Sequence, residues 1–213
     1  MKVFLYIYYF FRSAVLRGFI NTIRLIRAEL LSEKKYGIST SSIKKSDSTE
    51  FFHYQGAGYQ VLSRIFEEIT PQTKSFNFVD IGSGMGRPVF VAEHFGYENL
   101  TGIELDKELV EAANLNLKHY LLKRKTSQIE FINVNALEYN YKNMSTVYFL
   151  FNPFNEVVLK NVLERILSFT KTETWFVYMN PKYAEVFVES KFEKLRELKT
   201  KRYLEAVIYK IRY

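Results

Sequence analysis

The chain has 213 residues, 47% of them apolar and 17% aromatic, which suffices for the core of one domain with a modest appendage. It has no cysteine and only three histidines, without ligand spacing, so we expect no disulfide, thiolate nucleophile or metal site. The net charge of +7 is concentrated in basic ends, residues 1–50 and 190–213, which favours a polyanionic neighbour such as a membrane, nucleic acid or acidic protein; solvated lysine on exposed faces is the alternative.

Residues 1–31 combine an apolar run with regularly placed arginines. The run from Val3 to Phe11 is too short to cross a bilayer, and no small-residue cleavage site follows it, so we expect a cytoplasmic protein. On a helical wheel the arginines span roughly 140°, opposite many large apolar residues, which predicts one basic amphipathic helix. Such a helix can contact a membrane surface peripherally, or pack on its own domain or a second subunit. The arginines are Arg12, Arg17, Arg24 and Arg27.

The remaining elements predict a domain at 51–213 that follows a polar linker at 32–50. Serine, lysine and threonine dominate the linker, so residues 1–50 form a separate helix-and-linker segment. A helical stripe at 59–69, closed by Pro71, precedes strands that alternate with helices. We expect strands at 76–81, 99–104, 128–133, 146–151 and 174–179, helices at 86–95, 106–121 and 155–168, a short helix near 182–189, and a hairpin of 192–198 with 203–213. This is an α/β fold with a mostly parallel sheet and an antiparallel C-terminal hairpin.

The most informative motif is FVDIGSGMGR at residues 78–87, an apolar strand followed by a glycine-rich turn. Gly82 and Gly84 allow a sharp turn and a close approach of backbone to a ligand. Asp80 would repel the pyrophosphate of a dinucleotide but would attract S-adenosylmethionine, whose ammonium and sulfonium groups are cationic. We expect Arg87 to be an exposed charge at the helix start.

A second acid supports the same cofactor. Glu104 ends the next apolar strand, where a carboxylate can accept hydrogen bonds from both ribose hydroxyls. The alternative is a glycine-rich turn that serves geometry only. Because the carboxyl ends of parallel strands share one edge of a sheet, we expect Asp80 and Glu104 to lie side by side.

This layout resembles the class I S-adenosylmethionine-dependent methyltransferases, with a Rossmann-like seven-stranded sheet, from about residue 54 to the end. The segments EKKYGISTSS, HYQGAGYQVL, FVDIGSGMGR and YFLFNPFN resemble, more narrowly, an uncharacterised bacterial methyltransferase family distantly similar to non-SET histone-lysine methyltransferases. The resemblance implies that Asp80 faces the methionine ammonium, that Gly82, Ser83 and Gly84 bind the cofactor, and that Glu104 holds the ribose.

Other cofactor and substrate positions also follow from the resemblance. Tyr54 would lie over the methionine end of the cofactor, with a packed loop tyrosine as the alternative. Asn135 stands where relatives place an acid that accepts from the adenine amino group; a turn or helix-cap asparagine is the alternative. Asn152, Pro153 and Phe154 resemble the Asn/Asp-Pro-Pro-aromatic signature of amino-methyltransferases without its second proline.

The chemistry implied is the methylation of a nitrogen. Asn152 would accept hydrogen bonds from the target amine and Phe154 would pack beside it, unless Asn152 and Pro153 only start a helix. We therefore expect an S-adenosylmethionine-dependent methyltransferase acting on a protein lysine amine. Two alternatives stay open: methylation of an RNA or DNA amino group, suggested by the basic ends, and a cofactor-binding module without catalysis.

Overall fold

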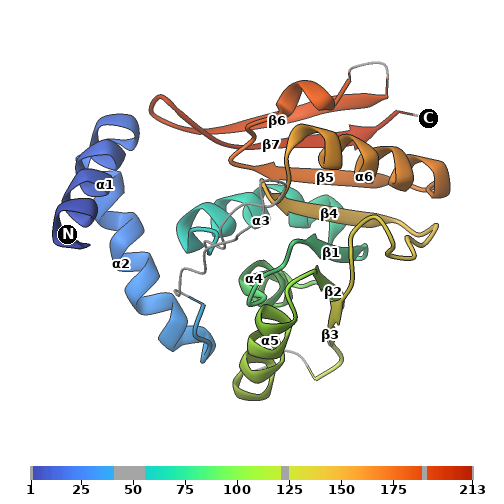
Figure 1. The fold of residues 1–213 in the computed structure, drawn as a ribbon, viewed down its shortest axis with the longest axis horizontal. Coiled ribbons are helices and arrows are strands. Elements are labelled where there is room, and N and C mark those ends of the chain that lie inside the picture. The colour runs from blue at the N-terminus through green and yellow to red at the C-terminus, as the bar shows by residue number, and fades with distance from the viewer. Residues whose placement is uncertain (1, 41–55, 121–124, 189–190, 213) are drawn as a thin grey trace.

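Seven strands form one sheet in the order β3-β2-β1-β4-β5-β7-β6 (Figure 1). The structure, a computed structural model, describes residues 2–40, 56–120, 125–188 and 191–212. The first five strands are parallel, and the last two pair antiparallel to β5 and to each other. The expected fold class is confirmed. The strands are β1 Asn77–Ile81, β2 Asn99–Glu104, β3 Gln128–Asn133, β4 Thr146–Phe151, β5 Thr174–Met179, β6 Phe192–Thr200 and β7 Tyr203–Ile211.

Helices cover both faces of the sheet because side chains along each central strand alternate between two apolar layers. Phe78 and Val147 face the layer that contains α3, α4 and α5, whereas Val79 and Tyr148 face the layer that contains α6. The helices on this frame are α3 Tyr59–Thr73, α4 Arg87–Phe95, α5 Lys107–His119, α6 Glu156–Phe169 and the single 3-10 turn η1 Ala184–Val186.

Two predicted elements of the domain differ from the structure by more than two residues at one end. Pro71 does not close the helix that begins at Tyr59, because α3 continues to Thr73 with the proline inside it. A proline there forgoes only the hydrogen bond to the carbonyl of Glu67, an exposed residue, so the last turn tolerates it. The short helix expected near 182–189 is reduced to η1.

The N-terminal segment is two helices, not one. Gly18, with φ of 91°, separates α1 Lys2–Arg17 from α2 Phe19–Tyr36. The helix is interrupted there, so the prediction of one amphipathic helix over residues 1–31, made from a single helical wheel, was wrong. Residues 32–36, predicted as linker, belong to α2, which ends at the left-handed Gly37; residues 41–50 lie outside the described ranges.

Candidate cofactor and substrate site

The glycine loop joins β1 to α4 at the carboxyl edge of the sheet. Its three glycines all have positive φ: 78° at Gly82, 52° at Gly84 and 87° at Gly86. At Gly82 an added Cβ would lie 2.7 Å from the Cβ of Pro153, so backbone and proline meet with no room for a side chain. The predicted cofactor loop and the predicted substrate motif are therefore in direct contact.

Asp80 lies at the end of β1 and is fully buried, with 1% of its surface exposed. Neither carboxylate oxygen, nor the hydroxyl of Ser83, has a hydrogen-bond partner among the residues that the structure describes. Burial, and secondly the charge of Glu104, raise the pKa of Asp80 well above its ordinary value. Buried polar groups are nearly always paired, so this carboxyl group and hydroxyl indicate a missing polar or cationic ligand.

Glu104, at the end of β2, is held in a fixed orientation by two backbone groups. The N–H of Gly84 donates to its Oε2 at 2.9 Å, and the N–H of Asp106 donates to its Oε1 at 3.0 Å. Burial raises the pKa of Glu104, and the backbone hydrogen bonds oppose that shift. Each carboxylate oxygen keeps acceptor capacity for a further donor, as a ribose diol requires.

The predicted acceptor motif, Asn152 to Phe154, follows β4. Asn152 is buried, with φ of 43°, and its Oδ1 accepts a hydrogen bond of 2.8 Å from the hydroxyl of Tyr178 on β5. Burial raises the pKa of Tyr178, so the hydroxyl stays a neutral donor. Phe154, two residues after Asn152, is also buried. Sequence reasoning missed Tyr178, although the pairing of adjacent parallel strands could have pointed to the end of β5.

The alternative role of Asn152 as a helix cap is wrong. The N-cap of α6 is Asn155, whose side chain accepts from the N–H of Val158 at 2.9 Å. Helix initiation therefore uses neither Asn152 nor Pro153 as its cap.

Asn135 forms a turn after β3. Its Oδ1 accepts from the N–H of Leu137 at 2.9 Å, and its carbonyl accepts from Glu138 and Tyr139. The turn role is thus present, and adenine recognition by Asn135 stays a prediction. Tyr54 lies outside the described residues.

Arg87 is the residue that sequence reasoning misplaced: it is buried, with 2% exposure, at the start of α4. Its guanidinium donates to Glu29 at 2.7 Å, to the hydroxyl of Thr40 at 2.7 Å and to the carbonyl of Ala57 at 2.8 Å, and lies over the Tyr59 ring. One cation therefore joins α2, α3 and the stretches around residues 40 and 57 to the helix that follows the glycine loop. The sequence suggested that Arg87 is solvent-exposed because its hydrogen-bond partners are distant in the chain.

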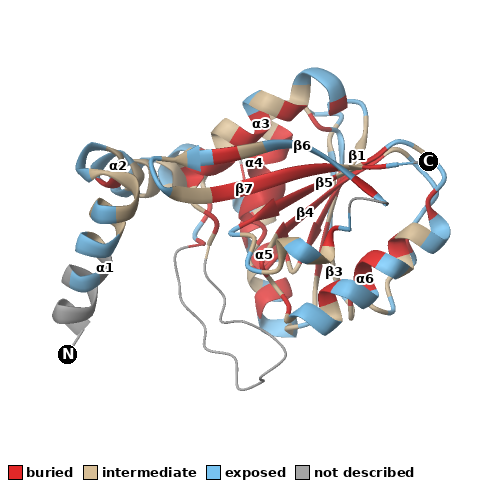
Figure 2. Ribbon diagram, turned by 90° about the horizontal axis from the view of Figure 1, so that it is seen from above, coloured by how far each residue is buried: buried red, intermediate tan, exposed pale blue. Residues whose placement is uncertain are grey.

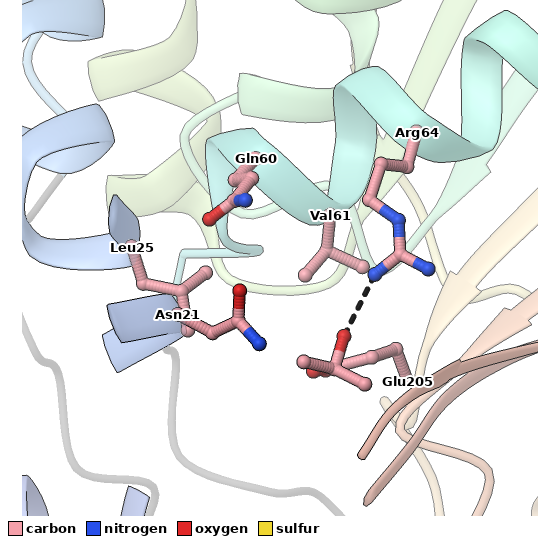
Figure 3. A pocket seen from close by; sticks show the side chains of 7 residues that line it. Asn21, Leu25, Gln60, Val61, Arg64 and Glu205 are labelled. Carbon is pink, nitrogen blue, oxygen red and sulfur yellow. Dashed lines mark hydrogen bonds between the residues drawn. The ribbon is translucent and has the colours of Figure 1, made fainter. Parts of the chain in front are cut away.

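A separate small pocket lies between α2, α3 and the C-terminal hairpin (Figure 3). Arg64 crosses it and donates to the hydroxyl of Thr200 at 2.7 Å. The pocket shares no residue with the glycine loop, Glu104 or the acceptor motif, so we assign it no part in the site. Its lining residues are Asn21, Leu25, Gln60, Val61, Arg64, Thr200 and Glu205.

Comparison with known families decides the assignment. Residues 31–181 match the family described as Histone methylation protein DOT1. The chain belongs to the DOT1 family. As a DOT1 family member it is an S-adenosylmethionine-dependent methyltransferase, and the expected superfamily and cofactor are confirmed. The unpaired carboxyl of Asp80 and the doubly held Glu104 fit that cofactor. No curated protein matches the sequence significantly.

Solved structures similar to this DOT1 family member are methyltransferases with different acceptors. Ribosomal protein L11 methylase from Lactobacillus delbrueckii is 16% identical, with a TM-score of 0.51 over 72% of this chain and 77% of that one. Magnesium protoporphyrin IX methyltransferase from Synechocystis, with bound SAM, is 12% identical, with a TM-score of 0.53 over 72% and 79%. The glycopeptide N-methyltransferase MtfA is 12% identical, with a TM-score of 0.56 over 69% and 94%. At these identities the likeness is one of fold.

Proposed function

We propose that the protein transfers the methyl group of S-adenosylmethionine to the side-chain amine of a lysine in a protein. The observation that carries the proposal is the contact between two loops: Pro153 lies against Gly82, which sets Asn152 directly beside the glycine loop. The family description, histone methylation, supports a protein acceptor.

The cofactor would be held by charges and backbone. Asp80 would accept a hydrogen bond from the methionine ammonium, which replaces its missing partner. Glu104 would accept from the ribose hydroxyls, Gly82, Ser83 and Gly84 would line the methionine and ribose portion, and Asn135 would take the adenine end. When bound, the cofactor supplies an electrophilic methyl group on a sulfonium.

Asn152 and its neighbours would position the acceptor. An amine attacks only as the neutral base, with its lone pair aligned on the methyl carbon, so orientation accounts for much of the rate. The Oδ1 of Asn152 already accepts from Tyr178 and has a second lone pair for an amine N–H. Transfer would exchange the C–S bond of the cofactor for a new C–N bond, and the methylated amine would release a proton to water.

The test is to incubate cell extract with S-adenosylmethionine labelled in its methyl group and to separate protein, nucleic acid and small molecules. We expect label in protein, recovered as methyl-lysine after hydrolysis. Asn152→Ala should lower the rate at saturating cofactor about 10²- to 10³-fold, as loss of one positioned polar group does in other enzymes, and leave cofactor affinity unchanged. Asn114→Ala, on the exposed side of α5, is the matched control.

Three results would contradict the proposal. Label in RNA or DNA would indicate amino-group methylation of nucleic acid instead. Label in protein outside lysine would exclude the lysine amine. Cofactor binding without transfer to any fraction would indicate a binding module.

A further inference from the structure

Tyr36 of the α1–α2 arm belongs to the core of the domain, yet much of the arm is exposed (Figure 2), and several of its exposed residues are large and apolar. On α2 the exposed fraction is 67% at Ile20 and 74% at Leu30. Exposed apolar surface of this extent marks an interaction site. The exposed apolar residues are Tyr8, Phe11 and Val15 on α1, and Phe19, Ile20, Ile23, Ile26, Leu30 and Leu31 on α2.

Charge is also divided between the two sides of α2. Its acids turn toward the domain, where both Glu29 and Glu33 contact Arg87. The exposed side contains no acid; instead four cations accompany the apolar residues, namely Arg24, Arg27, Lys34 and Lys35. At 100° per residue Arg27 and Lys34 fall within the apolar stripe, and Arg24 and Lys35 fall at one margin.

The arm is fixed to the domain at two places, so this face has a defined direction. Arg17 forms two hydrogen bonds with Glu205 on β7, of 2.7 and 3.0 Å, and lies over the Tyr203 ring. Arg87 holds the other end through Glu29. Of the arm's basic residues, Arg17 is therefore used internally, and the cations on the outer side of α2 remain exposed.

We propose that the outer face of α2 binds an anionic membrane surface. Apolar side chains flanked by Lys and Arg, without acids, match the boundary between acyl chains and anionic headgroups, where long basic side chains reach the headgroups while their stems stay in apolar surroundings. No helix in the described part of the chain is long and apolar enough to cross a membrane, so the arm would lie along the surface.

A second copy of the chain fits this face poorly. A two-fold contact pairs one patch with itself, so Arg27 and Lys34 would be buried against a face whose charged residues are all cations. No acid on the outer side of α2 is present to neutralise them. Like charges in a desolvated contact are unfavourable, whereas anionic lipid supplies the missing opposite charge.

The test is flotation of the whole protein with vesicles of phosphatidylcholine, with and without phosphatidylglycerol. We expect binding that needs the anionic lipid. Ile23→Ser with Leu30→Ser should lower vesicle affinity at least about tenfold, because two apolar side chains are lost from the interface. Arg27→Gln with Lys34→Gln should lower it about 30-fold, or about fivefold per cation.

The matched control is Val157→Ser with Leu115→Ser, two residues of similar exposure on α6 and α5, which should change vesicle affinity less than about twofold. Circular dichroism and cofactor affinity establish that each variant is folded. The proposal is overturned if the intact protein ignores anionic vesicles, if the α2 variants bind as well as the intact protein, or if ultracentrifugation shows a dimer that Ile23→Ser with Leu30→Ser dissociates.

Discussion

Replacing Asp80 by asparagine should stabilise the free protein and weaken its binding of S-adenosylmethionine. Asp80 is a buried carboxyl group without a partner in the described structure, so in the absence of cofactor it costs stability whenever it is ionised. In the proposed site, the same group would accept a hydrogen bond from the ammonium of the bound cofactor. One substitution thus separates stability from affinity.

The size of both effects follows from that missing partner. An unpaired buried polar group costs about 1–3 kcal/mol and a charged one costs more, so replacing the carboxyl group by an amide, which stays buried and polar but cannot ionise, should raise the free energy of unfolding by about 1 kcal/mol or more at neutral pH. For a chain of this length, Tm would rise by about 2–4 °C per kcal/mol. A hydrogen bond between charged groups contributes about 1.5–3 kcal/mol, so Kd for the cofactor should rise about 10- to 150-fold.

The raised pKa of Asp80 also predicts how stability and cofactor affinity depend on pH. Burial and the Glu104 charge raise the pKa of Asp80, so the folded free protein retains this proton to a higher pH than the unfolded chain does. Its stability therefore declines as pH rises from the unfolded pKa toward the folded one. The bound ammonium favours the carboxylate, so cofactor binding should release a proton and strengthen as pH rises through the pKa of Asp80 in the free protein.

Calorimetry in two buffers with different ionisation enthalpies measures affinity and proton release together, and thermal unfolding without cofactor measures stability. Glu111→Gln, an exposed acid on α5, is the control and should change neither. If Asp80→Asn bound the cofactor as tightly as the natural protein, or if affinity were independent of pH, the assignment of Asp80 to the ammonium would fail.

Two further predictions follow from the packing. Gly82→Ala should destabilise the fold by about 1–3 kcal/mol and weaken cofactor binding, because the new Cβ would lie 2.7 Å from Pro153 and the backbone has a φ of 78°. The control is Gly58→Ala, whose Cβ would have no neighbour nearer than 3.8 Å and should be tolerated. Equal losses of stability for the two variants in thermal unfolding would refute the argument. Arg87→Ala should lower the free energy of unfolding by about 3 kcal/mol in chemical denaturation, because it leaves Glu29 and the hydroxyl of Thr40 without this partner. Arg87→Lys should recover only part of that loss, since one ammonium cannot reproduce the guanidinium contacts. If Arg87→Ala left the free energy of unfolding unchanged, the cluster would contribute little to stability.

The strands of the domain were predictable because their apolar runs are short and end at turn residues. The same pattern placed Asp80 and Glu104 at one sheet edge, where burial first and the charge of Glu104 second raise the pKa of Asp80. The glycine loop could be predicted without tertiary information, because its glycines indicate the turn and Asp80 indicates a cationic ligand.

The parts that sequence could not give depend on partners distant in the chain. Arg87 follows the glycine loop like any surface charge, and its burial depends on Glu29, Thr40 and Ala57 from other segments. The N-terminal helix was projected as one because an isolated glycine is tolerated inside a helix, although Gly18 after Arg17 is also a local signal for a helix end. Asn152 and Asn155 both precede a helical stripe, and only the backbone path decides which caps it.

Because Gly82 and Pro153 are in contact, a change at Pro153 would affect both sides of the proposed site, the donor side at the glycine loop and the acceptor side at Asn152. In the proposed site, a substitution at Pro153 that alters acceptor preference should therefore also alter the affinity for the donor. Evolution of a new acceptor preference would then begin with substitutions in other loops at the strand edge, and Pro153 would be among the last residues to change.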